Sequence, residues 1–434
     1  MNTKNKETFI QNIRTYFKDD ADKFLVLLNE EPKSAFFLNE TKADIEKIFS
    51  IIDFKYEKSL LNPKSYYYFD TSIGKSKAYE LGLIYPQDVE SSLPCSFIDT
   101  NNIKYAIDLC SAPGGKSINI LNRLNEDALL ISNDINYKRA NILSNNLERL
   151  GLNPIVTSNK IDYFTTNFKN VFDLVILDVP CSGEGIIRKY PEIIDEYSNA
   201  NIDTLAYKQS VLLQQAYELL NNDAYLLYST CTYSFKEDEE QIKNFLNKYE
   251  DMELIELPLI NKHSQLKGTI KLSILDNTEG QFMALLHKKG NKENIKLKYN
   301  KPINNETVDK FIKDNLDIKD YYLYHKEEKY YLSFKPLIDI DNYLSYGIYL
   351  GNLENKIFKP AHSMYRSNLL IDKYKYTYDL SDKEYADYIS GKELKIDKED
   401  HYYLLTYKDL SLGYGKLSNG ILKNKYPKGL RRVV

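Results

Sequence analysis

The sequence of 434 residues contains no tryptophan, only four cysteines and no long hydrophobic run. Four cysteines in a chain of this length do not make a disulfide framework, so we expect a reducing, cytoplasmic compartment. No stretch approaches the roughly 18 uninterrupted apolar residues that a membrane helix needs, so we expect no membrane partner. The first residues lack an apolar segment after their lysines, so we also expect no secretory signal.

Acidic and basic residues nearly balance, with 62 Asp and Glu against 58 Lys and Arg, and the formal charge is −4. Hydrophobic residues make up 43% and charged residues 28%, which excludes collagen-like and wholly disordered chains. The charge balance gives no indication of a nucleic-acid partner, but a net charge hides how the charges are distributed. At roughly 150 residues per domain, the length predicts two to four domains.

The first hundred residues give a mixed pattern. Apolar residues recur at helical spacing over residues 10–28, and Pro32 marks the end of this helix. Residues 42–52 are a second helical candidate, and the aromatic residues 66–69 favour a strand. From there to Pro94 no regular pattern is present, so we expect irregular structure.

From Lys104 onward, short apolar segments alternate with amphipathic segments. We expect strands at residues 105–109, 128–132, 155–156, 172–177, 224–228 and 280–287. Helices are expected from about residue 116, around 140–150, over 205–220 and over 237–249. This alternation predicts βαβ units in a doubly wound, mostly parallel α/β sheet. The polar, lysine-rich residues 290–304 predict a linker, and the chain after them predicts short strands and turns.

A glycine-rich loop, residues 108–117, follows the first of these strands. It is neither the G-x-G-x-x-G dinucleotide fingerprint nor a phosphate-binding P-loop. The simplest interpretation is a tight turn between a strand and a helix. Asp134, at the end of the second strand, favours a ligand instead, because an acidic residue there can accept hydrogen bonds from ribose hydroxyls. The combination predicts an adenosine-bearing cofactor without a pyrophosphate.

Two cysteines follow the next strands: Cys181 lies in residues 178–185, and Cys231 lies in residues 228–233. An isolated cysteine is most often a small buried residue. Zinc binding would need C-x-x-C pairs or nearby histidines, and neither cysteine has them, so we expect no metal. A redox pair would need C-x-x-C spacing. A thiolate nucleophile with a second thiol or an acid opposite it remains.

Together these motifs resemble the Sun/Nop family of RNA cytosine-5 methyltransferases, which use S-adenosyl-L-methionine. The resemblance is strongest to the bacterial ribosomal-RNA branch of the RsmF type. Residues 108–116 resemble the family's cofactor loop, and the segments around Cys181 and Cys231 resemble its two cysteine motifs. Residues 82–92 are similar to the lead-in to the catalytic domain, and residues 412–431 to the C-terminal domain of the RsmF branch. The resemblance therefore spans most of the chain.

The resemblance implies three parts. Residues 101–290 would form a Rossmann-like methyltransferase domain with a doubly wound, mostly parallel sheet. Residues 1–100 would form a small N-terminal α+β domain that leads into it and binds RNA. Residues 305–434 would form a C-terminal α+β or β-rich RNA-binding region of one or two small subdomains. We expect a monomer that acts on ribosomal RNA or on a small-subunit assembly intermediate.

The resemblance also implies roles for single residues. Cys231 would be the nucleophile that adds to carbon 6 of cytosine, and Cys181 would assist release. Asp178 would hydrogen-bond the cytosine, while Lys116 would orient the base or bind the cofactor's carboxylate. For Asp162, matched to the residue that reads the adenine, the alternative is a solvated loop aspartate. The full set implied for cofactor binding is Cys110, Ser111, Ala112, Pro113, Gly114, Gly115, Lys116, Asp134, Arg139, Asp162 and Asp178.

The end of the chain is the expected RNA contact. Residues 411–434 carry six basic residues and no acidic one: Lys416, Lys423, Lys425, Lys428, Arg431 and Arg432. Aromatic and basic residues together suit stacking on unpaired bases and holding phosphates. The alternative is a solvated tail. Arg188 and Lys189, beside the cysteine motif, are a second expected RNA contact.

Two segments depart from the family pattern: an arginine usually precedes Asn39, and the pattern around Lys271 is degraded. Transfer RNA is the nearest rival substrate. A non-catalytic RNA-binding or ribosome-assembly factor is a rival of another class, and retention of Cys181, Cys231, Asp178 and Lys116 argues against it. A thiol-redox enzyme is a third, and it lacks a flavin or nicotinamide fingerprint.

Overall fold

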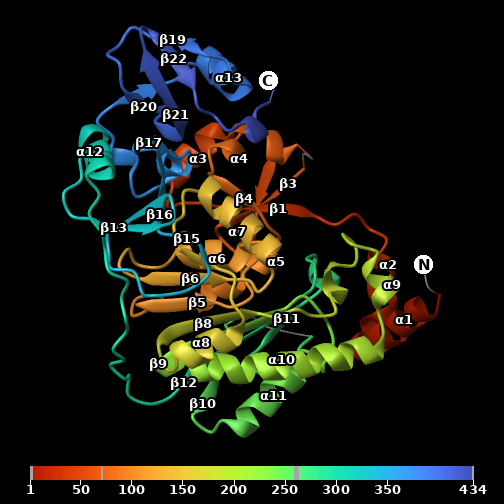
Figure 1. The fold of residues 1–434 in the computed structure, drawn as a ribbon. Helices are drawn as coiled ribbons and strands as arrows, with labels where there is room; N and C mark the ends of the chain where they lie inside the picture. Colours follow the sequence, from red (N-terminus) through yellow and green to blue (C-terminus); the bar gives the residue numbers. More distant parts are fainter. Residues whose placement is uncertain (1–2, 70–71, 259–262, 433–434) are drawn as a thin grey trace.

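A computed structural model describes residues 3–69, 72–258 and 263–432 (Figure 1). Its largest sheet has the order β10-β12-β9-β8-β5-β6-β7-β15, with β11 paired to β12. The strands are β5 (Tyr105–Asp108), β6 (Leu129–Asn133), β7 (Ile155–Thr157), β8 (Phe172–Asp178), β9 (Leu220–Thr230), β10 (Met252–Ile255), β11 (Ile270–Leu272), β12 (Gln281–Lys288) and β15 (Tyr343–Tyr346). Strands β5 to β9 run parallel, and the four others pair antiparallel at the two edges. The predicted doubly wound, mostly parallel sheet is confirmed.

Helices cover both faces of this sheet. Ile107 and Val175 point to a core shared with α8 (Ile161–Asn167), α10 (Asn199–Leu219) and α11 (Glu239–Lys248), which lie together along one side in Figure 1. The alternate residues Ala106 and Ile176 point to the opposite core, on the side of α6 (Gly115–Leu121). The helix α7 (Tyr137–Arg149) packs beside them through Leu143. Burial on both faces explains why these strands are almost continuously apolar.

The order of the strands fixes where a ligand can bind. The chain runs from β5 outward through β6 and β7, and then returns to β8 and β9 on the other side of β5. The carboxyl ends of β5 and β8 therefore lie side by side where the direction of winding reverses. In open α/β sheets, the crevice at this position is the place where ligands bind.

The N-terminal helical segment is broken into two helices, α1 (Thr3–Phe17) and α2 (Ala21–Leu27). The prediction of one helix over residues 10–28 is wrong because Lys18 adopts a positive φ of 47° and starts a 3₁₀ turn. The two helices pack near α9 (Ile193–Glu196), where the rings of Phe9 and Tyr197 meet edge-on at 5.5 Å. This segment therefore closes over the loop that follows β8.

A small antiparallel sheet follows, with the order β2-β3-β1-β4. Its strands are β1 (Ser34–Leu38), β2 (Tyr56–Lys58), β3 (Ser65–Tyr68) and β4 (Ile84–Pro86), and its helices are α3 (Ile45–Ile51), α4 (Lys77–Glu80) and α5 (Val89–Ser92). The prediction of irregular structure up to Pro94 is wrong. Elements of three or four residues are too short to show a hydrophobic period in the sequence.

The C-terminal part contains two further sheets, β13-β14-β16-β17 and β18-β20-β21-β22-β19. The first comprises β13 (Tyr322–Lys326), β14 (Lys329–Ser333), β16 (Ile348–Glu354) and β17 (Ile357–Pro360); the second comprises β18 (Thr377–Asp379), β19 (Leu394–Lys395), β20 (Tyr402–Tyr407), β21 (Leu410–Ser418) and β22 (Ile421–Asn424). The predicted short strands are present, but so are two helices that we did not predict, α12 (Glu306–Asn315) and α13 (Asp382–Ser390). A capping box of Ser381 and Glu384 begins α13 and was the sequence signal for it.

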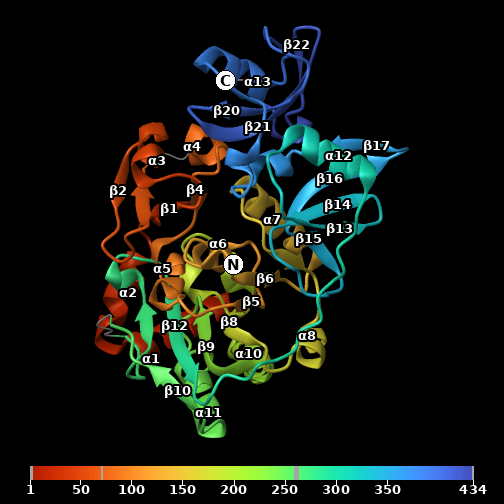
Figure 2. The ribbon, with the colours of Figure 1, turned by 90° about the vertical axis from the view of Figure 1, so that its left-hand side faces the viewer.

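The N-terminal sheet and the last sheet share one hydrophobic core. Phe36 and Ile84 pack in the same cluster as Leu405 and Leu412. Figure 2 shows the last sheet seated beside α3 and α4. No helix among the described residues is long and apolar enough to cross a membrane.

A buried arginine joins the three parts of the chain. Arg366 donates hydrogen bonds to the carbonyl oxygens of Ser411 at 3.1 Å, of Glu80 at 2.8 Å and of Arg149 at 2.7 Å. Glu80 and Arg149 lie at the C-terminal ends of α4 and α7, where helix carbonyls lack partners within the helix. One guanidinium therefore satisfies acceptors from the N-terminal, central and C-terminal parts.

Candidate active site

A cavity of about 860 Å³ opens at the carboxyl ends of the central strands. Three loops that the sequence singled out reach it: the loop after β5, the loop after β8 and the loop after β9. Predicted site residues on its wall are Cys110, Ala112, Pro113, Lys116, Arg139, Asp178, Cys181 and Cys231. The fold thus brings together motifs that lie more than a hundred residues apart in the sequence.

Cys181 and Cys231 lie in contact with each other on the wall of this cavity. Their Sγ atoms lie 3.1 Å apart, and the Cys231 backbone N–H donates a hydrogen bond to the Cys181 Sγ at 3.3 Å. The contact with Cys231 and burial both raise the pKa of the Cys181 thiol well above its usual value. Cys181 therefore keeps its proton at neutral pH, next to a second thiol.

Two buried carboxylates hold the cysteine loops. Glu237 accepts hydrogen bonds from the Ser182 backbone N–H at 3.0 Å and from the Gln209 amide at 2.9 Å, and Gln209 also donates to the Pro180 carbonyl at 2.9 Å. Glu184 accepts from the Thr232 hydroxyl at 2.9 Å and so connects the two loops. We predicted neither carboxylate from the sequence, although Glu184 lies inside the segment around Cys181 and Glu237 lies four residues after the segment around Cys231.

Two glycines let the loops approach closely. The Gly185 N–H donates to the Cys231 carbonyl at 2.9 Å, and the Gly280 N–H donates to the Gly185 carbonyl at 2.8 Å. A Cβ atom at position 185 would lie 2.5 Å from the Gly280 Cα. No larger residue fits there without displacing the backbone that carries Cys231.

An ion pair lies beside the cysteines. The Lys116 Nζ lies 3.2 Å from an Asp178 carboxylate oxygen, and the Ser229 hydroxyl donates to the other oxygen. Burial lowers the pKa of Lys116, but Asp178, Cys95 and Asp108 together outweigh it, and the net shift is upward. The Lys116 side chain is only 4% exposed, whereas that of Asp178 is 35% exposed, so Asp178 presents its carboxylate to the cavity.

The loop after β5 contains two buried oxygen atoms without a partner. Asp108 is fully buried and accepts from the Ser117 hydroxyl at 2.8 Å through one oxygen, while its other oxygen has no hydrogen-bond partner. The Ser111 hydroxyl is also buried and unpartnered. Burial raises the pKa of Asp108 to about 7. A ligand that carries donors or positive charge would satisfy these atoms.

Asp134 and Arg139 lie next to this loop. Asp134 is buried at the end of β6, and Arg139 lies 3.6 Å from its carboxylate and donates to the Ala112 carbonyl at 2.5 Å. Gly114 has a φ of +123°, a conformation that L side chains rarely adopt. The turn that begins α6 therefore favours glycine at position 114.

Asp162 is not among the residues that line the cavity. Its side chain is exposed, and its carboxylate accepts a hydrogen bond from Gln215 of α10 at 2.5 Å. This placement matches the alternative of a surface aspartate at the start of α8.

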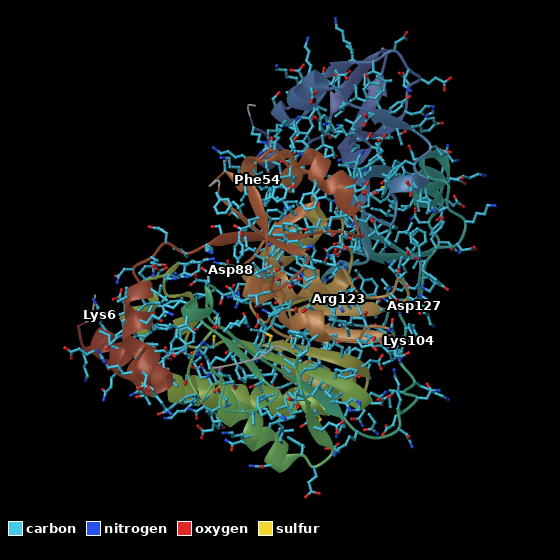
Figure 3. All side chains as sticks on the ribbon, turned by 180° about the vertical axis from the view of Figure 1, so that it is seen from behind. Lys6, Phe54, Asp88, Lys104, Arg123 and Asp127 are labelled. Carbon is cyan, nitrogen blue, oxygen red and sulfur yellow. The ribbon has the colours of Figure 1, made fainter. Side chains whose placement is uncertain are left out.

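Arg188 and Lys189 do not lie on an open surface. The Arg188 side chain is 8% exposed, and its Nε lies 3.2 Å from the buried Glu279 carboxylate. Lys189 forms an ion pair with Asp88, which Figure 3 labels between the N-terminal segment and the central sheet. Both cations are paired with carboxylates, of which Asp88 lines the cavity. Direct RNA contact by Arg188 and Lys189 stays a prediction.

The basic residues at the end of the chain lie on an ordered sheet. Lys416 on β21 and Lys423 on β22 are opposite each other in register, and both are exposed. Arg432 is different, because it lies 3.4 Å from the Glu80 carboxylate. The remaining basic residues, Lys425, Lys428 and Arg431, are exposed.

The two segments that depart from the family pattern are both buried. Asn39 donates to the Gly82 and Leu150 carbonyls at 2.8 and 2.9 Å. Lys271 lies 3.0 Å from Asp238 and 2.7 Å from Glu239 in a buried ion cluster. Within the described ranges, no group of three or more His, Cys, Asp or Glu side chains could hold a metal ion.

Comparison with known proteins gives two matched segments. Residues 96–287 match the family described as 16S rRNA methyltransferase RsmB/F, and residues 375–432 match the methyltransferase RsmF PUA domain. The Ribosomal RNA small subunit methyltransferase F of Shewanella piezotolerans is 27% identical over 392 residues, which cover 83% of this chain and 82% of that protein. The tRNA (cytosine(49)-C(5))-methyltransferase of Pyrococcus abyssi is 29% identical over 288 residues, which cover 62% of this chain and 93% of that protein.

A solved structure shares the fold. The methyltransferase homologue from Pyrococcus horikoshii superimposes with a TM-score of 0.56 at 23% identity, over 64% of this chain and 93% of that chain. This likeness confirms the Rossmann-like methyltransferase fold.

Proposed function

We propose that this chain, whose residues 96–287 match the RsmB/F methyltransferase family and whose residues 375–432 match the RsmF PUA domain, methylates carbon 5 of cytosine in RNA of the small ribosomal subunit, with S-adenosyl-L-methionine as methyl donor. The observation that carries the proposal is the pair of thiols, 3.1 Å apart, in a cavity where the β5, β8 and β9 loops converge. The family match and the named relatives supply the reaction class.

The loop after β5 fits this cofactor. S-adenosyl-L-methionine supplies an electrophilic methyl group on a positively charged sulfur, and it also carries an amino group. The unpartnered oxygen of Asp108 and the hydroxyl of Ser111 are acceptors suited to such a ligand. Asp134 would accept hydrogen bonds from the ribose. Residues 110–116 would form the wall against which the cofactor lies.

The two cysteines have different roles in the covalent reaction. We assign the attacking thiolate to Cys231, because the segment around it resembles the family's second cysteine motif. A bond from its Sγ to carbon 6 of cytosine makes carbon 5 nucleophilic, so that carbon 5 can accept the methyl group. The proton on carbon 5 must then leave and the bond from Sγ to carbon 6 must break. Cys181, in contact with that sulfur, assists this release.

Asp178 would position the base. Its carboxylate is fixed by Lys116 and Ser229 and is still partly open to the cavity. It can therefore hydrogen-bond the amino and ring-nitrogen edge of cytosine. A base can reach this depth only if it is unpaired or flipped out of its stack.

We choose ribosomal RNA as the substrate because of how much of the chain its relatives match. The small-subunit relatives match 83% of the chain, and the last 58 matched residues belong to a domain model of the RsmF type. A transfer-RNA substrate is the second candidate, because the Pyrococcus abyssi relative acts on tRNA. We propose that the chain acts in the cytoplasm as a monomer, on ribosomal RNA or an assembly intermediate.

Bisulfite sequencing of ribosomal and transfer RNA from a deletion strain tests the substrate. We expect 5-methylcytosine to disappear from small-subunit RNA and to return with the wild-type gene but not with Cys231→Ala. Loss of the mark from transfer RNA alone would assign the second candidate, and unchanged marks in both RNAs would contradict the proposal.

Purified variants test the two cysteines separately. Cys231→Ala should abolish methyl transfer while leaving cofactor binding nearly intact. Cys181→Ala should form the covalent adduct but release it slowly, giving a protein–RNA species that survives denaturing electrophoresis. Cys95→Ala is the matched control, because Cys95 is buried outside the cavity and should leave activity unchanged. Full activity of Cys231→Ala would refute the assignment of the nucleophile.

A further inference from the structure

A second hollow lies far from the cysteines, between α12, β17 and the last sheet. Its volume is about 510 Å³. We call it the C-terminal hollow; residues that define it are Lys310, Phe311, Lys356, Phe358, Tyr402 and Lys416. In Figure 1, α12 and β17 lie at the opposite end of the molecule from α10 and α11. It belongs to neither the cofactor loop nor the cysteine loops.

Aromatic rings form its floor. The ring centroid of Phe311 lies 4.7 Å from that of Phe358 and 5.6 Å from that of Tyr402. Phe358 is buried, whereas Phe311 and Tyr402 are half-buried and so present part of each ring to the hollow. The Tyr402 hydroxyl makes no hydrogen bond within the described part of the chain, so the ring is held by packing. Half-exposed rings of this kind suit stacking against a flat, partly polar group.

Lysines form its rim. Lys310, Lys356 and Lys416 are exposed, and none of the three forms a salt bridge with a carboxylate in the described ranges. The Lys416 Nζ lies 5.3 Å from the Tyr402 ring centroid, so this charge stands over the aromatic floor. Two acidic residues, Asp314 and Asp400, also line the hollow, which leaves the rim net positive.

The sheet extends this basic face beyond the rim. Lys423 is the cross-strand partner of Lys416, and cross-strand partners project from the same face of a sheet. Arg432, in contrast, turns toward Glu80 of the N-terminal part. Of the basic residues at the end of the chain, Lys416 therefore lines the hollow and Lys423 lies beside it on the same face of the sheet, whereas Arg432 belongs to another surface.

We propose that the C-terminal hollow binds an unpaired nucleotide of the RNA substrate. The base stacks on Tyr402, whose ring lies at 69° to that of Phe311, so that Phe311 borders the edge of the base. The flanking phosphates lie against Lys310, Lys356 and Lys416. Stacking platforms bordered by positive charge are how proteins bind single-stranded nucleic acid without reading its sequence. The inference rests on the proposed function only for the identity of the ligand as RNA. Unpaired lysines around aromatic rings disfavour the basic tails of ribosomal proteins as the occupant.

A charge-reversal experiment tests the rim. The double variant Lys310→Glu/Lys416→Glu is compared with Lys208→Glu/Lys243→Glu, which changes two exposed lysines on α10 and α11 by the same charge. Fluorescence anisotropy with labelled decauridine and with small-subunit RNA gives Kd between 50 and 300 mM salt. We expect the rim variant to bind at least tenfold more weakly and its salt slope to fall by about 1.4, at about 0.7 per phosphate on a single strand.

A second pair of variants tests the floor. Tyr402→Ala should weaken binding of decauridine by about tenfold, since stacking contributes roughly 1–3 kcal/mol per base, and Tyr402→Phe should retain wild-type affinity. Thermal unfolding of both variants shows whether the alanine variant keeps its fold. If Tyr402→Ala does not keep its fold, the comparison of the rim variant with its control alone tests the proposal.

Methylation kinetics separate this proposal from the proposed function. With small-subunit RNA as substrate, the rim variant should have a higher KM for RNA than the control variant. Its kcat at saturating RNA and its affinity for the cofactor should be unchanged. If RNA affinity and KM equal those of the control variant, the hollow is not an RNA site, whether or not the enzyme methylates. If no form of the enzyme methylates RNA while the rim variant still loses RNA affinity, the proposed reaction fails and the binding site stands.

Discussion

Asp108 should make the apoprotein less stable as the pH rises toward neutrality. The carboxyl is fully buried and one oxygen has no partner, so burial raises its pKa to about 7. An aspartate in an unfolded chain has a pKa of about 3.9. Below about pH 4 both states are protonated, and between pH 4 and pH 7 only the unfolded state ionises. The folded state therefore loses free energy of unfolding as the pH rises through this range.

The magnitude follows from the separation of the two pKa values. At about 1.4 kcal/mol per pKa unit, the loss reaches about 4 kcal/mol above pH 7 and about 3 kcal/mol between pH 5 and pH 8. Asp108→Asn removes the charge, so the variant should gain stability relative to the wild type by this amount over the same range. If the amide changes the free energy of unfolding by an amount that does not depend on pH, that amount cancels when the values at pH 5 and pH 8 are subtracted.

Urea unfolding at pH 5, 6, 7 and 8, followed by far-ultraviolet circular dichroism, measures this difference. Asp127→Asn is the matched control, because Asp127 is exposed and should give a curve parallel to the wild type. We also expect Asp108→Asn to bind S-adenosyl-L-methionine more weakly by calorimetry, although its free energy of unfolding falls less than that of the wild type as the pH rises. Parallel curves for Asp108→Asn and the wild type would show that the pKa of the carboxyl is the same in the folded and unfolded states, and the reasoning would be refuted.

Three further predictions concern the framework. Gly185→Ala, with its Cβ 2.5 Å from Gly280, should cost about 1–3 kcal/mol in urea unfolding and lower kcat while cofactor affinity persists; a wild-type kcat would contradict the close approach. Lys271→Met leaves the buried carboxylate of Asp238 unpaired and should lower the free energy of unfolding by about 3–5 kcal/mol, whereas a neutral effect would mean that the cluster is hydrated. Truncation before Ser411 removes a core strand and should abolish cooperative thermal unfolding; a folded, soluble product would show that the last sheet is dispensable.

Local sequence patterns predicted the centre of the fold well. The first strand was expected at residues 105–109 and is Tyr105–Asp108, and the helix expected around residues 140–150 is Tyr137–Arg149. These elements are long or strongly apolar, so their period is visible in the sequence. The edge strand Tyr343–Tyr346 could not be predicted to join this sheet, because its pairing with β7 joins segments far apart in the chain.

Some residues of the candidate site could be predicted from the sequence, and others could not. The cysteines and Lys116 lie just after parallel strands, and Asp178 is the last residue of one. The alternation of strands and helices in the sequence is therefore enough to place all four at one edge of the sheet. Arg188 is expected to contact RNA because it lies beside a cysteine motif in the sequence, but the side chain is paired with Glu279, which lies 91 residues away. Partners this far apart in the sequence are brought together by tertiary packing, so they cannot be predicted from a local motif.

The core that the first and last sheets share has a consequence for synthesis. Phe36 and Ile84 are made early, but Leu405 and Leu412, against which they pack, are made about 300 residues later. At roughly 5–20 residues per second, the apolar face of the first sheet stays uncovered for about 15–60 seconds while the rest of the chain is translated. The nascent chain must therefore wait, exposed, until its last strands leave the ribosome, and a ribosome that stalls near the end of the message would release a chain prone to aggregate.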